Sequence, residues 1–172
     1  MNSIFKRASV RKYTDQPVSK EQIEMLLKAG MAAPSAKNVQ PWEFVVIQSK
    51  ETMFDIMKFH PYSAMLKQAP FAIAVCGNTT KIALEGVEDL WVQDCAAATQ
   101  NILLEATELG LGSVWMGVYP KKEYINGLSN LLILPDFIVP FSLIAIGYPE
   151  GEPHPKDKFN SERIHWEKWS GK

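Results

Sequence analysis

The stretch EDLWVQDCAAATQNILLEATEL, residues 88–109, contains neither proline nor glycine and consists mainly of good helix formers. Its apolar residues recur at close to the helical period, and Ala96 and Ala97 widen the apolar face that they form. The stretch therefore predicts one long helix, and a face this wide is typical of a central helix or of a helix shared with a second subunit. The glycines of GLG (110–112) are expected to end that helix, and SVWMGVY (113–119) predicts a strand after it.

Helices and short apolar strands alternate along the rest of the chain. Ser19 and Gln22 have the spacing of a capping box, which predicts a helix that ends before Pro34. The near-continuous apolar runs, which are typical of strands buried on both faces, are EFVVIQ (43–48), FAIAVC (71–76) and FSLIAIGY (141–148). Further helices are expected near the N-terminus and at residues 51–59 and 121–131, with an extended segment at 9–18.

No internal repeat, low-complexity tract or Gly/Ser-rich linker divides the chain. With 172 residues, of which 47% are hydrophobic and 22% are charged, the sequence is long enough for one sizeable core. We therefore expect one domain over residues 1–172. Residues 149–172 are polar and interrupted by prolines, so we expect them to form a C-terminal arm outside the core.

Composition and residue spacing exclude several classes of protein. The formal net charge is −1 and the 18 basic residues are scattered, so nucleic acid is not an expected partner. The N-terminal residues lack a secretory signal, and no apolar stretch approaches the roughly 20 residues of a membrane span, so we expect a soluble cytoplasmic protein without membrane contact. Cys76 and Cys95 stand singly in apolar surroundings and predict buried, inert thiols, and the three histidines are too dispersed to indicate a metal site.

Two basic clusters lie at opposite ends of the chain. Arg7, Ser9 and Arg11 are spaced two residues apart, so in an extended segment their side chains share one face and can converge on one anion. Lys156 and Lys158 have the same spacing in a proline-rich segment. Each cluster alone is compatible with solvated surface charge, but the shared spacing in two irregular segments also indicates a pair of phosphate-binding arms.

The segment APSAKNVQPW (33–42) connects a predicted helix to a predicted strand. Pro34 cannot continue a helix, and the residues after it carry hydroxyl, ammonium and amide groups at loop positions, where binding residues are common. Local chemistry leaves two interpretations open: a helix stop followed by a turn, with Trp42 in the core, or part of a binding site.

Four motifs occur in order along the chain: R-x-S-x-R at 7–11, APSAKNVQPW followed by EFVVI, the Ala-rich helix that leads to LGLGSVWMGVYP, and a tail with PKDK and ERIHW. Over essentially the whole chain they resemble the nitroreductase family of FMN-dependent oxidoreductases. The resemblance implies an α+β fold, a three-layer sandwich in which helices flank a mixed central β-sheet. It also implies an intertwined homodimer with two FMN sites at the interface, in which the C-terminal arm, with Trp166 and Trp169, wraps on the partner subunit.

The resemblance further implies which residues contact FMN. They are Arg7, Ser9, Arg11, Pro34, Ser35, Ala36, Asn38, Trp115, Met116, Gly117, Lys156 and Lys158. The N-terminal three are expected at the phosphate, the ribityl chain and a flavin carbonyl, and the lysine pair is expected to close over the phosphate. The loop residues 34–38 reach the flavin held mainly by the other subunit, and residues 115–117 lie along the isoalloxazine ring, where one backbone N–H donates to flavin N5. Family members often carry arginine in place of Lys158, and lysine lacks the bidentate geometry of that side chain.

The implied activity needs no catalytic side chain, because the flavin carries the hydride chemistry and the protein supplies position and electrostatics. NADH or NADPH reduces FMN and leaves, and an electron-poor small molecule such as a nitroaromatic or a quinone then accepts the electrons, which is a ping-pong cycle. Other interpretations stay open: reductive dehalogenation, flavin destruction or flavin reduction on the same fold; a non-enzymatic FMN-binding protein; or a nucleotide-binding module without flavin. The sequence does not identify the acceptor, the preferred nicotinamide, or the roles of Lys37 and Trp91.

Overall fold

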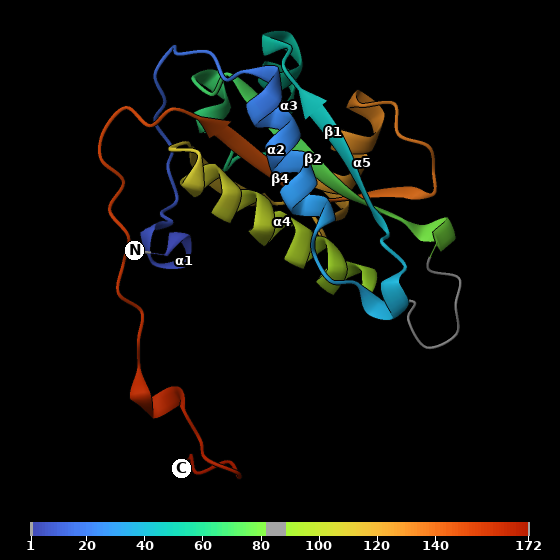
Figure 1. The fold of residues 1–172 in the computed structure, drawn as a ribbon. Helices are drawn as coiled ribbons and strands as arrows, with labels where there is room; N and C mark the ends of the chain where they lie inside the picture. The colour runs from blue at the N-terminus through green and yellow to red at the C-terminus, as the bar shows by residue number, and fades with distance from the viewer. Residues whose placement is uncertain (1, 82–88, 172) are drawn as a thin grey trace.

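The computed structural model of the chain describes residues 2–81 and 89–171 (Figure 1). Its helices are α1 (Ser3–Lys6), α2 (Lys20–Met31), α3 (Lys50–Phe59), α4 (Trp91–Glu108) and α5 (Lys122–Leu131). Its strands are β1 (Trp42–Ile47), β2 (Phe71–Asn78), β3 (Gly112–Gly117) and β4 (Ile138–Gly147). Short 3-10 helices are found at η1 (Ala36–Asn38), η2 (Ala64–Lys67), η3 (Thr79–Lys81) and η4 (Ser161–Arg163). The helices and strands occur where the sequence predicts them, with ends that differ by a few residues.

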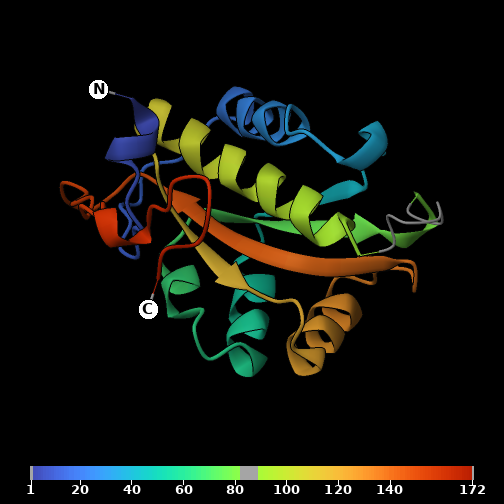
Figure 2. The same ribbon diagram turned by 90° about the horizontal axis from the view of Figure 1, so that it is seen from below.

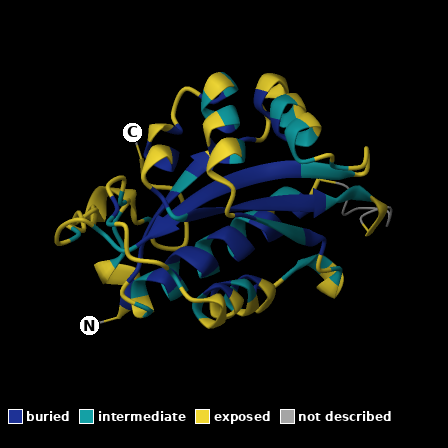
Figure 3. Ribbon diagram, turned by 90° about the horizontal axis from the view of Figure 1, so that it is seen from above, coloured by how far each residue is buried: buried dark blue, intermediate teal, exposed yellow. Residues whose placement is uncertain are grey.

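The sheet is the middle of three layers (Figure 2). Helices α2 and α4 cover one face, where Leu26 and Ile102 are fully buried. Helices α3 and α5 cover the other face, where Ile56 and Leu128 are buried. The buried residues concentrate in the strands and on the helix sides that face them (Figure 3). This arrangement confirms the predicted α+β fold with a sheet between helices.

The strand order is β1-β2-β4-β3, and each neighbouring pair is antiparallel. The sheet formed by the described strands is therefore antiparallel, and the expected mixed sheet is wrong for them. A parallel pairing does occur as an isolated bridge between Ser9 and Ser113, beside β3. The apolar runs correctly indicated burial on both faces for β2 and β4, but most residues of the edge strand β1 are only partly buried. Such a run has the same composition in either strand direction, so the sequence did not distinguish parallel from antiparallel pairing.

Helix α4 is the central helix that the sequence predicts. Its fully buried apolar residues are Cys95, Ala98, Ile102 and Ala106. Ala96 and Ala97 stay partly exposed. Gly110 follows the helix with φ of 71°, a left-handed conformation that costs glycine little. Glu88, where the helix was expected to begin, lies outside the described residues. Within the two described ranges, neither α4 nor any other helix has the length and apolar character needed to cross a bilayer.

The capping box at the start of α2 is confirmed. The Ser19 hydroxyl oxygen accepts the Gln22 backbone N–H at 3.2 Å, and the Gln22 side-chain oxygen accepts the Ser19 backbone N–H at 3.1 Å. Two otherwise unpaired donors of the first turn are thereby satisfied. The helix ends at Met31, before Pro34, as predicted.

Cys76 on β2 and Cys95 on α4 are free and buried, which confirms the prediction of two structural thiols. The Cys95 sulfur lies 3.6 Å from the carbonyl oxygen of Cys76. Burial raises the pKa of the Cys76 thiol to about 12, and burial also raises the pKa of Cys95. Both thiols therefore stay protonated, and hence poor nucleophiles, at neutral pH.

Beyond Gly147 the chain leaves the sheet and continues as a tail that extends away from the three layers (Figure 1). The side chains of Phe159, Trp166 and Trp169 are 77%, 85% and 79% exposed. The tail therefore adds no apolar side chain of this size to the core of its own chain.

Candidate functional site

A cavity of about 780 Å³ lies between the N-terminal segment and the C-terminal tail. Arg7, Ser9 and Arg11 line it from one side, and the segment 156–158, with two lysines and Asp157, lines it from the other. The structure thus brings together the two basic clusters from opposite ends of the sequence. Four cationic side chains against one carboxylate make this cavity suited to an anion.

Hydrogen bonds to the sheet hold the N-terminal segment in place. The Val10 N–H donates to the Ser113 carbonyl oxygen at 3.0 Å, next to the parallel bridge between Ser9 and Ser113. The Tyr13 hydroxyl donates to the Val10 carbonyl oxygen at 2.7 Å and lies 3.1 Å from a carbonyl oxygen of β4. Burial raises the pKa of Tyr13, so its hydroxyl stays protonated and able to donate. The basic residues on either side of Val10 are therefore attached to an anchored backbone.

The C-terminal tail begins beside the same segment. Pro149 forms an isolated antiparallel bridge with Tyr13, and the Glu150 N–H donates to the Lys12 carbonyl oxygen at 3.1 Å. Residues 154–163 are exposed. The lysine pair thus faces the cavity from a segment whose start is anchored and whose remainder is in solvent.

Strand β3 is an edge of the sheet and offers backbone groups on the side away from β4. The Ser113 carbonyl is on that side, because it accepts the Val10 N–H. Backbone groups alternate sides along a strand, so the N–H groups of Trp115 and Gly117 also face away from β4, and that of Met116 faces β4. A Cβ placed at Gly117 would meet no described atom within 4 Å. This end of β3 therefore has room for a flat ligand next to backbone donors.

Aromatic side chains surround the same end of β3. Trp115 is half-buried and meets Phe141 edge to face, with ring centroids 5.7 Å apart. Phe141 also meets Trp91, whose ring centroid lies 5.0 Å from that of Tyr119. Met116 is buried on the opposite face of the sheet, against the α3 and α5 layer. Trp91 is thus part of an aromatic cluster that includes Trp115 of β3.

The predicted loop residues, 34–36 and Asn38, lie at the other end of α4 from the cavity. The Ala36 N–H donates to the Asp94 carboxylate, in the first turn of α4, at 3.0 Å. Helix α1 lies beside the last turn of α4 (Figure 2). Because α4 has 18 residues, the two ends are roughly 27 Å apart. Within one chain, the structure therefore does not bring the loop residues to the basic cavity.

Two residues that contact predicted site residues were missed in the sequence. Asp94 is buried and accepts a hydrogen bond from the loop. Its position on the buried side of α4, between Trp91 and Cys95, could have indicated a buried carboxylate with a hydrogen-bond donor. His60 is buried, and its Nε2 lies 2.9 Å from the Gly117 carbonyl oxygen. A single histidine after a helix carries no pattern that predicts this contact.

A model of the nitroreductase family matches residues 4–63 and 57–148. A protein of Methanothermobacter thermautotrophicus, described as "Putative NADH dehydrogenase/NAD(P)H nitroreductase", is 46% identical over 169 residues, which cover 98% of this chain and 87% of that protein. A solved structure from Parabacteroides distasonis with the same description is 43% identical, has a TM-score of 0.92, and covers 97% of this chain and 96% of its own. A structure from Desulfovibrio desulfuricans, in complex with FMN, is 32% identical with a TM-score of 0.80 and covers 97% and 95% of the two chains. The motifs, the three-layer fold and these matches along nearly the whole length show that the chain belongs to the nitroreductase family.

Proposed function

We propose that the protein binds FMN and transfers electrons from NADH or NADPH to electron-poor small molecules such as nitroaromatics or quinones in a ping-pong cycle. Membership of the nitroreductase family supports an NAD(P)H-dependent flavin oxidoreductase, and a family relative at 32% identity was solved in complex with FMN. The observation that carries the proposal is the convergence of Arg7, Arg11, Lys156 and Lys158 on one cavity.

The cavity fits the phosphate and ribityl portion of FMN. Its volume of about 780 Å³ lies within the range of roughly 300 to 1,000 Å³ that is usual for ligand pockets. The guanidinium groups of Arg7 and Arg11 suit a phosphate, which accepts paired, charge-assisted hydrogen bonds. Ser9 adds a hydroxyl donor, and Lys156 and Lys158 add two mobile point charges. We therefore assign these five residues to the phosphate end of the cofactor.

The open edge of β3 fits the isoalloxazine ring. The N–H groups of Trp115 and Gly117 face away from β4, so we assign the donor to flavin N5 to one of these two. Met116, whose N–H faces β4, is then a packing residue that holds the strand against the α3 and α5 layer. Backbone donors fixed in a sheet need no rearrangement to stabilise negative charge on a ligand.

The loop residues Pro34, Ser35, Ala36 and Asn38 are proposed to complete the flavin site of a second copy of the chain. Within one chain the length of α4 separates this loop from the phosphate cavity, and we propose that the loop instead reaches the flavin of a second chain. The exposed Trp166 and Trp169 support an interface, because tryptophan is enriched where proteins associate. We propose an intertwined homodimer in which residues 149–172 form an arm on the partner, and sedimentation of the purified protein tests it. A monomer with full FMN affinity would contradict this arrangement.

Bound FMN supplies the hydride chemistry, so the contribution of this chain is position and charge. Arg7 and Arg11 hold the anionic end of the cofactor on a backbone that is bonded to the sheet. Trp91 and Tyr119 meet edge to face, with ring centroids 5.0 Å apart, and we propose that they give the acceptor or the nicotinamide an aromatic surface to pack on. We assign no side chain as an acid or base.

The first test is the flavin content of the purified protein. We expect a yellow protein with FMN equimolar to subunits, whose absorbance NADH or NADPH bleaches without oxygen. A colourless protein that FMN cannot reconstitute would contradict the proposal. Bound flavin that neither nicotinamide reduces would instead favour a non-enzymatic FMN-binding protein. Turnover with a nitroaromatic, a quinone, a halogenated phenol and free FMN then separates the proposed activity from dehalogenation and flavin reduction.

A further inference from the structure

The loop Ser35–Gln40 has a backbone conformation that its residues do not favour. Lys37, Asn38 and Gln40 have φ of 50°, 56° and 51°, in the left-handed region that residues other than glycine seldom adopt. Asparagine tolerates this region better than lysine or glutamine does. Such residues persist only where surrounding contacts hold them, and they cluster at ligand sites. The contacts that hold this loop are therefore of functional interest.

Hydrogen bonds within the loop close it on itself. The Gln40 N–H donates to the Ser35 hydroxyl oxygen at 2.9 Å, and the Asn38 N–H donates to the Ser35 carbonyl oxygen at 3.0 Å. These bonds define the shape of the turn. They do not attach the turn to the rest of the protein, so its position depends on other contacts.

Asp94 attaches the loop to α4. Its carboxylate oxygen Oδ1 accepts the Ala36 N–H at 3.0 Å, and the residue is only 7% exposed. A carboxylate removed from water requires a donor of this kind, and the bond it forms is stronger than one between neutral groups. The first turn of α4 also favours negative charge, because the helix N-terminus carries partial positive charge. The loop is thus bonded to a buried position on the central helix.

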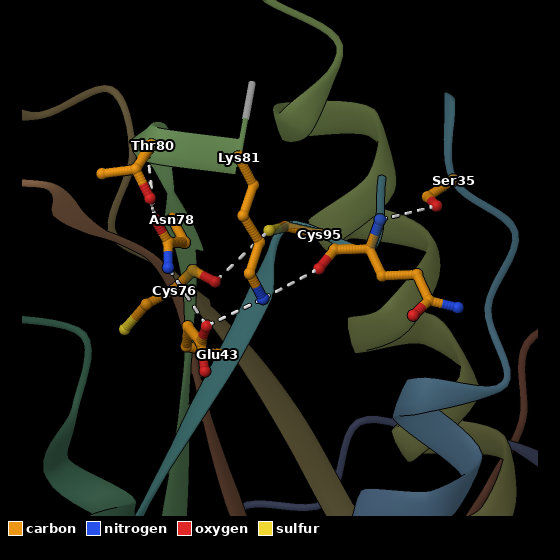
Figure 4. Close-up of polar contacts among 8 residues, drawn as sticks. Ser35, Glu43, Cys76, Asn78, Thr80, Lys81 and Cys95 are labelled. Atoms are coloured by element: carbon orange, nitrogen blue, oxygen red, sulfur yellow. Dashed lines mark hydrogen bonds and ion pairs between the residues drawn. The ribbon is translucent and has the colours of Figure 1, made fainter. Parts of the chain in front are cut away.

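Lys81 attaches the end of the loop less firmly. Its ammonium lies 3.4 Å from the Gln40 carbonyl oxygen. It also forms an ion pair with the Glu43 carboxylate at 3.0 Å (Figure 4). The side chains of Lys81 and Glu43 are 42% and 43% exposed. Exposed ion pairs contribute little, so we expect the buried Asp94 to matter more than Lys81.

We infer that Asp94 is a positioning residue, which holds the Ala36 N–H so that the Ser35–Gln40 loop keeps the shape that completes the flavin site of the other subunit. The inference rests on the proposed function and on the proposed action of the loop across the dimer interface. Asp94 does not touch the cofactor in this arrangement. It acts through the Ala36 N–H of its own chain, whereas the flavin site that this loop completes belongs to the other chain.

Variants of the full chain separate the hydrogen bond from the charge, with FMN affinity measured by quenching of flavin fluorescence. Asp94→Ala removes the acceptor and should weaken FMN binding roughly 10- to 100-fold. Asp94→Asn keeps an acceptor oxygen without the charge and should restore most of the affinity. Lys81→Met should change the affinity less than about threefold. Wild-type affinity in Asp94→Ala, or equal losses in Asp94→Ala and Asp94→Asn, would overturn the inference.

Mixed dimers distinguish positioning from damage to the fold. One chain carries Asp94→Ala, and a differently tagged chain carries Arg7→Ala and Arg11→Ala. If Asp94 acts through the loop across the interface, one site of the mixed dimer combines intact arginines with an intact loop, and half of the sites should bind FMN with wild-type affinity. If Asp94→Ala only damages its own chain, no site is intact, and the absence of restored binding would overturn the inference.

A substitution in the loop tests the same hydrogen bond if the Asp94→Ala protein does not fold. Ala36→Pro removes the donor and leaves α4 unchanged, and the Ser35 backbone, with ψ of 153°, suits a residue that precedes proline. FMN binding should weaken in Ala36→Pro. Wild-type affinity in this variant would overturn the inference about Asp94 but not the proposed function. A wild-type protein that binds no FMN would overturn the proposed function as well, so the two failures are distinguishable.

Discussion

The Nε2 atom of His60 lies 2.9 Å from the carbonyl oxygen of Gly117, and this contact joins the end of α3 to the end of β3. A carbonyl oxygen only accepts hydrogen bonds, so Nε2 carries the proton. The imidazole ring also packs on Tyr124, with centroids 4.4 Å apart. Among the described residues, Nδ1 has no hydrogen-bond partner. The N–H and C=O of a strand residue point to the same side, so the Gly117 carbonyl also faces away from β4, and the contact with His60 fixes it there.

His60→Leu should lower the free energy of unfolding by about 1–3 kcal/mol, because the Gly117 carbonyl loses its donor and the ring contact with Tyr124 is lost. His60→Gln places an amide N–H near the former Nε2 and should cost less. Urea denaturation of the two variants measures the difference. Equal midpoints for His60→Leu and the wild type would show that the contact is unimportant for stability.

Gly117→Ala should weaken FMN binding while leaving stability nearly unchanged. The added methyl meets no described atom within 4 Å, but it occupies the space proposed for the flavin ring, so affinity should fall by roughly tenfold or more. Gly110→Ala is the matched control, because its Cβ is equally free while its φ of 71° disfavours alanine. That variant should lose about 1 kcal/mol of stability and keep its affinity. If Gly117→Ala binds FMN like the wild type, the ring does not lie at this edge of β3.

Arg7→Ala and Arg11→Ala should each weaken FMN binding by roughly tenfold or more, because each removes a charge-assisted hydrogen bond to phosphate. Lys158→Arg should tighten binding, because a guanidinium can bond two phosphate oxygens at once. Lys122→Ala, on the distant helix α5, is the control for a general loss of positive charge. Titrations at two salt concentrations complete the test, since the proposed ion pairs predict weaker binding at higher salt. If these substitutions and the added salt leave the FMN affinity unchanged, the phosphate of FMN does not bind in this cavity.

Alkaline conditions should destabilise the fold through Cys76. The unfolded thiol releases its proton near its ordinary pKa of 9.0, whereas burial keeps the folded thiol protonated until a pH of about 12. Between these values the unfolded state is favoured increasingly as pH rises, so this part of the stability is intact below pH 9 and declines above it. Cys76→Ala should unfold with a weaker dependence on pH over this range, as measured by urea midpoints. An identical pH dependence in both proteins would contradict the assignment to this thiol.

Local patterns were sufficient for the elements that position the site. These patterns are the Ser19–Gln22 capping box, the apolar period of α4 and the glycine after that helix. Each depends on residues only a few positions apart, so the local sequence is enough to predict the structure it forms. The resemblance to the nitroreductase family was confirmed for the same reason, since its motifs are short and ordered along the chain. The roles of the FMN-contacting residues stay predictions.

Tertiary structure alone decided how distant segments meet. Three such relationships were not predicted: the antiparallel pairing of the strands, the bond from Ala36 to Asp94, and the contact of His60 with Gly117. No local period or composition encodes such a pairing, because the same apolar run or single charged residue is compatible with many partners. Only the packing of the whole chain, including α4 and β3, determines which partner each residue contacts. That packing also forms the surface on which the proposed chemistry takes place.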